Sequence, residues 1–451
     1  MNIMTAAEAA KAMGGTCSGE ASFSEVCIDT RSITPGCLYI AIKGDRFDGH
    51  DFVAKAFEAG AAAAVCSRDV EADGTIIRVE DTRKALIDLA AYNRSKYQIP
   101  VVGLTGSVGK TTTKDMVAYV LGQRYRTLAT EGNFNNEIGL PRMCLRLDDS
   151  IEAAVFEMGM SNFGEISRLT TTAKPTIGLI TNIGVSHIEM LGSREGILKA
   201  KMEILDGMDK DAKLVLNGDD DMLRTVIAKN PWRVVSYGIE REDVDFRATD
   251  IKQGEDSISF TLSGRKKSWE IKIPVIGIHN VYNACAAFIC GAIAGVPASD
   301  AIEGLANYVP DARRQKIEDR SGVKLISDCY NASPDSIRAS LSVLCQVPCS
   351  GRKIAVLGDM FELGDYAETA HRQCGEAVAE KDVDMLFAVG KNAAYYIEGA
   401  NGKVTSKYFE DKESLADALK NELREGDAVL FKASRGMKLE EVIDKVFSQQ
   451  D

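Results

Sequence analysis

Short apolar runs separated by amphipathic stretches dominate the middle of the chain. IPVVGLT (99–105), AAVFEMG (153–159), TIGLITNIG (176–184) and KLVLNG (213–218) are almost wholly apolar. Runs of this length are typical of strands buried in a parallel sheet, and the segments between them have helical length and pattern. The alternation predicts a parallel α/β sheet over this part of the chain.

The pattern changes at two places further on. Within residues 244–276, SISFTL alternates polar and apolar positions and SWEIKIPV follows a Ser-Gly-Arg turn, which predicts an antiparallel hairpin attached to the sheet. A Pro-Asp-Ala-Arg-Arg stretch near residue 310 indicates a linker. After it, strand-like runs resume at VKLISD (323–328) and predict a separate Rossmann-like domain.

Before Ile99 the strand-like runs CLYIAIKG, AAAAVCS and TIIRVE are short and are broken by Gly and Asp turns. The opening stretch MNIMTAAEAAKAMGG has the pattern of a short amphipathic helix. A chain of 451 residues is too long for one ordinary core. We therefore expect an α/β protein of three domains: an N-terminal domain at 1–98, a central phosphate-loop domain at 99–311 and a C-terminal Rossmann-like domain at 312–451.

Composition excludes several classes of protein. Apolar residues make up 45% and charged residues 27%, as in soluble globular proteins. The net charge of -12 argues against a nucleic-acid or membrane-surface binder. No apolar run reaches the roughly 18 residues of a membrane span, and the opening stretch lacks the features of a signal peptide, so we expect a cytoplasmic protein.

The 11 cysteines form no CxxC pair, and there are only 4 histidines. A structural zinc site is therefore not expected, and the cysteines are interpreted as reduced, mostly buried small apolar residues.

The strongest local motif is LTGSVGKTTT (104–113), which joins a predicted buried strand to a predicted helix. Glycines at 106 and 109 let backbone N–H groups wrap phosphate oxygens at a helix N-terminus. Lys110 is then expected to reach the β- and γ-phosphates and Thr111 to offer its hydroxyl to Mg²⁺. The spacing differs from the common GxxxxGK[ST] pattern, because Leu104 stands five positions before Gly109. The expected nucleotide-binding residues of this loop are Thr105, Gly106, Ser107, Gly109, Lys110, Thr111 and Thr112.

This loop and the motifs that follow it resemble the Mur ligase family, which also includes folylpolyglutamate synthetase. The central motifs are TEGNFNNEIGLP (130–141), FEMGMSNFGEI (156–166), NIGVSHIEMLGS (182–193), KAKMEIL (199–205) and GIHNVYNACAA (277–287); the later ones are SDCYNASPDS (327–336), LGDMFELG (357–364), AHRQCGE (370–376) and KASRGMKLEEV (432–442). The later motifs, and IDTRSITPGCLYIAIKG with FDGHDF near the start, are similar to the family member that adds D-alanyl-D-alanine to UDP-N-acetylmuramoyl-tripeptide.

The resemblance implies an ATP-dependent ligase. A carboxylate of the UDP-N-acetylmuramoyl-tripeptide is activated by the γ-phosphate of ATP as an acyl phosphate, and the amine of D-alanyl-D-alanine displaces phosphate. An anionic carboxylate approaching a triphosphate needs metal ions and cationic side chains to screen the repulsion, so ATP and Mg²⁺ are the implied cofactors. A monomer is expected. Whether the tripeptide ends in diaminopimelate or lysine stays open.

The resemblance also implies a set of metal-binding residues. Glu157 is expected to bind Mg²⁺ and His187 to support a second Mg²⁺, with Thr111 at the loop. The alternatives are a helix cap or surface carboxylate for Glu157 and a packing role for His187. Lys201 is expected to carry a CO₂-derived carbamate, which needs a neutral amine, and Lys199 is a competing position two residues away.

Further roles come from the same resemblance. Arg314 is expected to approach the phosphates when the domains close, with Arg313 as the competing choice. Asn280 and Asn283 are expected to bind the nucleotide, with Asn280 near adenine, although Asn as a helix cap is the alternative. The remaining expected contacts are Asp328, Tyr330 and Asn331 with the nucleotide, Lys432, Ser434 and Arg435 with the dipeptide, Thr30, Arg31, Ser32, Lys43 and Gly44 with UDP, and Asn133, Asn135 and Asn136 with the sugar–peptide portion. His50 is interpreted as structural.

Two other functions compete with this interpretation. A folylpolyglutamate synthetase would not need the 98 residues before the phosphate loop. An ATP-driven switch would turn over ATP without requiring two further substrates together.

Overall fold

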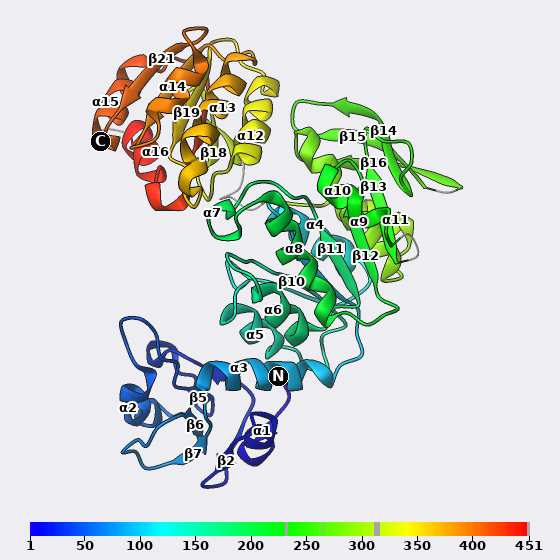
Figure 1. The fold of residues 1–451 in the computed structure, drawn as a ribbon, viewed down its shortest axis with the longest axis vertical. Coiled ribbons are helices and arrows are strands. Elements are labelled where there is room, and N and C mark those ends of the chain that lie inside the picture. The colour runs from blue at the N-terminus through cyan, green and yellow to red at the C-terminus, as the bar shows by residue number, and fades with distance from the viewer. Residues whose placement is uncertain (231–232, 265, 311–315, 449–451) are drawn as a thin grey trace.

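The computed structural model describes residues 1–230, 233–264, 266–310 and 316–448. Three α/β units follow one another along the longest dimension of the molecule (Figure 1). The N-terminal unit lies at one end, the C-terminal unit at the other, and the central unit between them. The mixed α/β class and the organisation in three units are confirmed.

The N-terminal unit is built on a five-stranded sheet in the order β2-β7-β6-β5-β4, parallel except for β2. The predicted opening helix forms as α1, and the Thr5 hydroxyl caps it by accepting a hydrogen bond from the Glu8 N–H at 3.1 Å. The elements are β1 (Met4–Thr5), α1 (Ala6–Ala12), β2 (Thr16–Cys17), β3 (Ser22–Phe23), β4 (Val26–Cys27), η1 (Thr30–Ser32), β5 (Leu38–Ile40), η2 (Gly49–Phe52), α2 (Val53–Glu58), β6 (Ala63–Cys66), β7 (Thr75–Arg78) and α3 (Thr82–Ser95).

The central unit contains a nine-stranded sheet in the order β16-β15-β14-β13-β12-β11-β8-β10-β9. Its elements are β8 (Val101–Thr105), α4 (Lys110–Gly122), β9 (Thr127–Ala129), α5 (Gly139–Cys144), β10 (Ala153–Glu157), α6 (Glu165–Ala173), β11 (Ile177–Ile180), α7 (Ile188–Leu191), α8 (Arg194–Met202), η3 (Glu203–Gly207), β12 (Lys213–Asn217), α9 (Asp221–Ile227), β13 (Val234–Gly238), β14 (Phe246–Gln253), β15 (Ile258–Gly264), β16 (Lys267–Ile273), α10 (Ile278–Ile293) and α11 (Ala298–Ala306).

The strands from β9 to β14 pair in parallel, and β15 and β16 form the predicted antiparallel hairpin. The sequence pattern did not predict β14, which joins this hairpin to the sheet. Its residues are mostly polar and only Ala248 is buried, so the strand has little apolar periodicity.

The C-terminal unit has a six-stranded sheet in the order β17-β18-β22-β19-β20-β21, parallel except for β17. Its elements are β17 (Lys316–Arg320), β18 (Val323–Asp328), α12 (Pro334–Gln346), β19 (Lys353–Gly358), η4 (Gly364–Tyr366), α13 (Ala367–Ala379), β20 (Met385–Val389), α14 (Ala394–Ala400), β21 (Thr405–Phe409), α15 (Lys412–Glu422), β22 (Ala428–Lys432), η5 (Arg435–Met437) and α16 (Glu440–Phe447).

One continuous apolar cluster joins the first two units. It runs from Met4 through Leu89 of α3 to Leu140 of α5 and Leu169 of α6. The buried clusters of the C-terminal unit lie largely within that unit; from the central unit, Ile276 belongs to one of them and Ile188 of α7 packs against it. Packing therefore couples the N-terminal and central units more tightly than it couples either to the C-terminal unit.

A buried arginine reinforces this junction. The Arg94 side chain on α3 donates hydrogen bonds to the carbonyls of Ala173 (2.8 Å) and Lys174 (3.1 Å) at the end of α6, and to that of Tyr97 (2.5 Å). A cation is favourable at a helix C-terminus, where the last carbonyls lack partners within the helix. Arg94 therefore attaches α3 to the central unit, although α3 precedes the expected boundary at residue 98.

All 11 cysteines are free thiols, and 7 of them are buried, as the sequence predicted. Within the described ranges, no helix combines the length and apolarity needed to cross a bilayer.

Candidate active site

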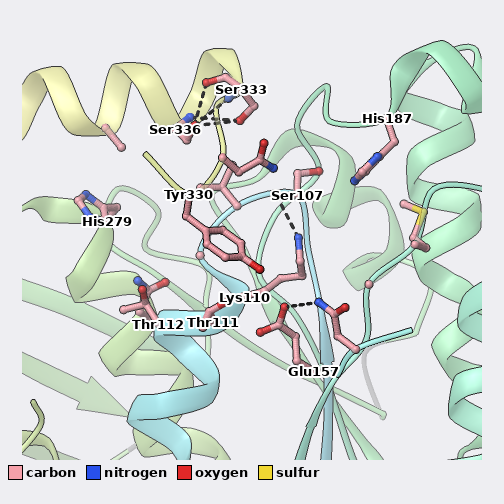
Figure 2. A pocket seen from close by; sticks show the side chains of 18 of the residues that line it. Ser107, Lys110, Thr111, Thr112, Glu157, His187, His279, Tyr330, Ser333 and Ser336 are labelled. Atoms are coloured by element: carbon pink, nitrogen blue, oxygen red, sulfur yellow. Dashed lines mark hydrogen bonds between the residues drawn. The ribbon is translucent and has the colours of Figure 1, made fainter. Parts of the chain in front are cut away.

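A cavity of about 380 Å³ lies at the carboxyl edge of the central sheet, where it faces the C-terminal unit. Figure 2 shows the phosphate loop at its centre, with Glu157 below Lys110, Tyr330 above and His187 to one side. The lining includes these predicted residues: Ser107, Gly109, Lys110, Thr111, Thr112, Asn135, Asn136, Glu157, His187, Lys201, Asn283, Asp328, Tyr330, Asn331 and Lys432. Strand ends of one sheet and a turn of another domain thus converge on one site.

Two glycines give the phosphate loop its shape. Gly106 has φ 155°, and a Cβ there would overlap the hydroxyl of Thr181. Gly109 has φ 83°, and a Cβ there would lie 2.9 Å from Oδ1 of Asn283. Any side chain at either position would displace the loop from the strand or helix beside it.

Two residues after β11 clamp this loop, and the sequence did not single them out. The Thr181 hydroxyl donates to the Val108 carbonyl at 2.7 Å. The Asn182 side chain accepts from the Val108 N–H (2.9 Å) and donates to its carbonyl (3.0 Å). The only available sequence signal was a pair of polar residues directly after a buried strand.

Lys110 is folded back onto its own loop. Its Nζ donates to the carbonyl of Gly106 at 2.8 Å and to that of Ser107 at 3.3 Å. Figure 2 shows Lys110 beside Ser107. A triphosphate offers a lysine stronger, charged acceptors than these carbonyls. The side chain is thus already at the loop that would hold the phosphates.

Glu157 ends β10 and is 3% exposed, so it is neither a surface carboxylate nor a helix cap. Its Oε1 accepts a hydrogen bond from Nδ2 of Asn135 at 2.8 Å, while Oε2 is buried with no hydrogen-bond partner. A buried carboxylate oxygen without a donor is costly unless a cation completes its surroundings. The geometry therefore fits a divalent cation at Oε2.

Lys201 on α8 is 1% exposed and lines the same cavity. Burial, and secondarily the charge of Lys110, holds the pKa of Lys201 well below its ordinary value. Its neutral form is therefore favoured, and a neutral amine is what carbamate formation requires. Lys199 is exposed, and its ammonium lies 5.6 Å from the centre of the Phe163 ring, which favours Lys201 between the two candidates.

No group of three or more His, Cys, Asp or Glu side chains that could hold a metal ion occurs in the described part of the chain. Mg²⁺ is commonly held by one or two carboxylates together with substrate phosphates and waters. The set at this cavity fits that kind of site: Glu157, the Thr111 hydroxyl, and Lys201 once it carries a carbamate.

His187 lies in the left-handed region, with φ 64°, and its Nδ1 is 2.7 Å from Oε2 of Glu362 in the C-terminal unit. This contact lowers the pKa of Glu362. It spans two units, and no pattern in the sequence indicated a role for Glu362.

The turn after β18 is held by a buried ion pair. Nζ of Lys432 lies 2.6 Å from Oδ2 of Asp328 and also donates to the Asn331 carbonyl at 3.1 Å. The Ser340 hydroxyl donates to the same Asp328 oxygen at 2.7 Å. Lys432, which was expected to bind the dipeptide, thus already has a carboxylate partner.

The predicted asparagines of α10 form a hydrogen-bonded chain. Nδ2 of Asn280 donates to the Ile276 carbonyl (2.8 Å), and Nδ2 of Asn283 donates to Oδ1 of Asn280 (3.1 Å). Oδ1 of Asn283 accepts from the Thr113 hydroxyl on α4 at 3.0 Å. Asn280 lies inside α10 rather than capping it, and of the two only Asn283 lines the cavity.

A second cavity, of about 220 Å³, contains the predicted Ser434 and Arg435. The Arg435 guanidinium lies 5.3 Å from the centre of the Tyr330 ring. The Ser434 hydroxyl accepts a hydrogen bond from the Phe361 N–H at 2.9 Å. His187 and Asn331 line both cavities, so the two spaces adjoin.

The residues expected to bind UDP lie on the N-terminal unit and line neither cavity. Arg31 is exposed and pairs with Asp29 at 2.6 Å, and its hydrogen bonds lower the pKa of Asp29 to about 2. Thr30 and Ser32 share the turn η1, Lys43 bridges to Asp48 by backbone pairing, and the Gly44 N–H donates to the Phe47 carbonyl.

Other predicted residues are placed as follows. His50 is 5% exposed and bonded to Asp48 and Ser67, consistent with a structural role. Asn133 is exposed and lines neither cavity. Arg313 and Arg314 lie outside the described residues.

Three family models match the chain. The Mur ligase middle domain matches residues 104–291, the Mur ligase glutamate ligase domain matches residues 312–435, and the Mur ligase family catalytic domain matches residues 22–94.

Relatives match over nearly the full length. The chain is 43% identical over 425 residues to UDP-N-acetylmuramoyl-tripeptide--D-alanyl-D-alanine ligase of Bacillus subtilis, covering 93% of this chain and 92% of that protein. Among solved structures, MurF from Acinetobacter baumannii aligns with a TM-score of 0.93 at 32% identity, covering 100% of both chains. MurF ligase from Thermotoga maritima in complex with ADP aligns with a TM-score of 0.83 at 30% identity, covering 94% of this chain and 97% of that one.

Proposed function

Because this chain belongs to the Mur ligase family, we propose that it joins D-alanyl-D-alanine to UDP-N-acetylmuramoyl-tripeptide at the expense of ATP. The product is the UDP-linked pentapeptide precursor of peptidoglycan, and the reaction is the last cytoplasmic step of its synthesis. One observation carries the proposal: the phosphate loop, Glu157 and Lys201 of the central unit share a cavity with Asp328 and Tyr330 of the C-terminal unit.

The first half of the reaction is activation of the tripeptide carboxylate. The loop N–H groups and Lys110 hold the triphosphate, with the γ-phosphate directed at the incoming carboxylate. Mg²⁺, when bound, screens the charge between the two anions. Glu157 through its unpartnered oxygen, Thr111, His187 and a carbamate on Lys201 are the groups proposed to hold it.

The second half is attack by the dipeptide amine on the acyl phosphate. Arg435 in the adjoining cavity is the proposed partner of the dipeptide carboxylate, since a guanidinium binds a carboxylate through two hydrogen bonds. Asn135 and Asn136 are proposed to meet the sugar–peptide portion, and the turn at Thr30–Ser32 is proposed to meet UDP. Arg314, or its neighbour Arg313, remains the candidate for contact with the phosphates on closure.

The competing functions account for less of the molecule. A folylpolyglutamate synthetase leaves the N-terminal unit without a role. A switch that only hydrolyses ATP leaves the second cavity without one. The chain spans 92% of the Bacillus subtilis ligase, so nearly the whole length of that relative has a counterpart here.

The cytoplasm is the proposed compartment and a monomer the proposed state. ATP and UDP-linked sugars are cytoplasmic metabolites, and 11 unpaired thiols are typical of a reducing compartment.

The test is phosphate release from ATP by purified protein given UDP-N-acetylmuramoyl-tripeptide and D-alanyl-D-alanine separately and together. We expect sustained release only with both, and a UDP-linked pentapeptide by mass spectrometry. Both the diaminopimelate and the lysine tripeptide must be supplied. ATP turnover without either substrate, or no ligation with either tripeptide, would overturn the proposal.

A further inference from the structure

The second cavity carries one charge of each sign. Its lining contains Arg435 from the turn after β22 and Glu362 from the loop after β19. Across the described residues no carboxylate forms an ion pair with Arg435, whose guanidinium lies over the Tyr330 ring. At about 220 Å³ the space is below the roughly 300–1,000 Å³ of pockets for drug-sized ligands. A small molecule with both a positive and a negative group suits it.

The loop that carries Glu362 is held firmly in place. The Phe361 N–H donates to the Ser434 hydroxyl at 2.9 Å, and the Ser434 N–H donates to the Asp359 carbonyl at 3.1 Å. These two bonds tie the loop to the turn that carries Arg435. The spacing between the two charged residues is therefore set by backbone contacts.

Glu362 itself has φ 61°, in the left-handed region that a non-glycine residue rarely adopts. Such a conformation is strained and persists only where surrounding contacts enforce it. It directs the Glu362 side chain toward His187 rather than back into its own domain. The strained backbone thus places a carboxylate at one end of the cavity.

That end is where the two cavities meet. His187 lies 2.7 Å from Glu362 and lines both spaces, and the larger space holds the phosphate loop. The Glu362 side chain is 59% exposed, so its second oxygen remains accessible to a ligand. A positive group bound there would lie beside the site of carboxylate activation.

We propose that Glu362 binds the ammonium group of the incoming dipeptide while Arg435 binds its carboxylate, so that Glu362 selects a zwitterionic acceptor and holds its amino end beside the activated carbonyl. The ammonium group loses a proton to solvent before the free amine attacks and phosphate leaves. This inference rests on the proposed function. It makes Glu362 a specificity-determining residue for the second substrate. It also explains why a carboxylate of the C-terminal unit faces a space that otherwise receives anions.

The same contact has a simpler explanation, in which Glu362 only orients His187. A carboxylate that accepts from one imidazole nitrogen commonly fixes the ring of a metal-binding histidine. The two roles differ in what they require. Orientation needs an acceptor oxygen, which an amide also provides, whereas ammonium binding needs the negative charge.

Glu362→Gln separates them in steady-state kinetics with each substrate varied in turn. The KM for D-alanyl-D-alanine should rise by about tenfold or more, the loss of one charge-assisted hydrogen bond. The KM values for ATP and for UDP-N-acetylmuramoyl-tripeptide should stay within about twofold. The analogue D-lactyl-D-alanine, which has a hydroxyl in place of the ammonium group and keeps the carboxylate, should inhibit wild type and variant alike, because it lacks the charge that Glu362 is proposed to bind.

Glu189→Gln is the matched control. Glu189 is exposed on α7, lies against Gly364 of the same loop and lines neither cavity, and its replacement changes the net charge equally. It should leave all three KM values unchanged. Glu362→Asp, which keeps the charge, should retain more dipeptide affinity than Glu362→Gln, and thermal melts check that both variants fold.

The outcomes distinguish this inference from the proposed function. If wild-type protein shows no dipeptide-dependent phosphate release, the proposed function is overturned, and this inference is overturned with it. Wild-type ligation combined with an unchanged dipeptide KM in Glu362→Gln overturns the role of Glu362 alone. A fall in kcat without a change in any KM would assign Glu362 to His187 instead and overturn the inference too.

Discussion

Asp328 and Lys432 are cross-strand neighbours at the carboxyl ends of β18 and β22, and their side chains form an ion pair of 2.6 Å with 14% and 2% exposure. The pair lies under the turn that brings Tyr330 and Asn331 to the larger cavity. It therefore serves first as an internal support of the site.

Replacing Lys432 with Met should destabilise the C-terminal unit by about 3–5 kcal/mol, because it leaves the Asp328 carboxylate buried without its cation. Denaturant unfolding followed by a probe in that unit measures the loss. The double variant Asp328→Asn, Lys432→Met should recover much of it. A loss below about 1 kcal/mol in the single variant would indicate an ordinary surface pair.

Replacing Lys110 with Met should lower kcat by about 10²–10³-fold, the effect of removing one preorganised donor from the developing charge. The protein should remain folded, since the Lys110 ammonium donates to carbonyls of its own loop rather than holding the loop to another element. Phosphate release and calorimetric titration with an ATP analogue measure the two effects. Near-normal turnover would mean that the loop is not the triphosphate site.

A carbamate on Lys201 is directly observable. Wild-type protein equilibrated with ¹³C-labelled bicarbonate should show a carbamate carbon resonance, because burial favours the neutral amine. Lys201→Met should lack the resonance and most of the activity. Lys199→Met is the control, since Lys199 is exposed, and it should keep both. A resonance that follows Lys199 would reverse the assignment.

Acid should weaken the C-terminal unit through His371. This residue is fully buried; its Nδ1 lies 2.7 Å from the Ala367 carbonyl and its Nε2 accepts from the Met360 N–H. Burial lowers its pKa below the ordinary 6.5. Between the two pKa values the unfolded chain binds more protons, so stability falls as pH drops below 6.5 and levels off once the folded imidazole is protonated.

His371→Gln removes this titration and should flatten that part of the pH dependence. Urea midpoints between about pH 8 and pH 5 for both proteins test it. Identical slopes would show that His371 protonates as readily in the folded protein as in the unfolded chain.

Domain closure should involve the C-terminal unit alone. Spectroscopic labels at the exposed positions Glu71, Asp211 and Lys403 report on the three units in turn. With an ATP analogue and the UDP-linked tripeptide, the distance from Asp211 to Lys403 should change. The distance from Glu71 to Asp211 should stay fixed, because one apolar cluster and Arg94 join those units. The opposite pattern would contradict this division.

The sequence predicted the parts of this protein that depend on local pattern. The strand before Lys110 and the strand ending at Glu157 were visible as apolar runs, and both were expected in one parallel sheet. The strand β14 was missed because its only buried side chain is Ala248. The clamp by Thr181 and Asn182 was also missed, since its polar residues look like any turn.

What the sequence could not predict depends on which segments become neighbours. Lys432 looked like an available cation until the pairing of β18 with β22 placed Asp328 beside it. Glu362 and His187 lie in different units and meet only through the packing of the C-terminal unit against the central one. The second cavity exists only in that packing, so no motif could have indicated it.

The shared core of the N-terminal and central units fixes the distance between their two proposed substrate-binding sites. The turn at Thr30–Ser32 and the phosphate loop are separated by packed side chains, not by a hinge. If UDP is held at the turn Thr30–Ser32 and the carboxylate is activated at the phosphate loop, the distance between UDP and the reacting carboxylate is fixed by the protein. One residue of extended peptide spans about 3.3–3.6 Å. A UDP-linked peptide that is one residue too short or too long would not bring its carboxylate to the γ-phosphate. The protein therefore discriminates this substrate by peptide length, independently of contacts with its side chains.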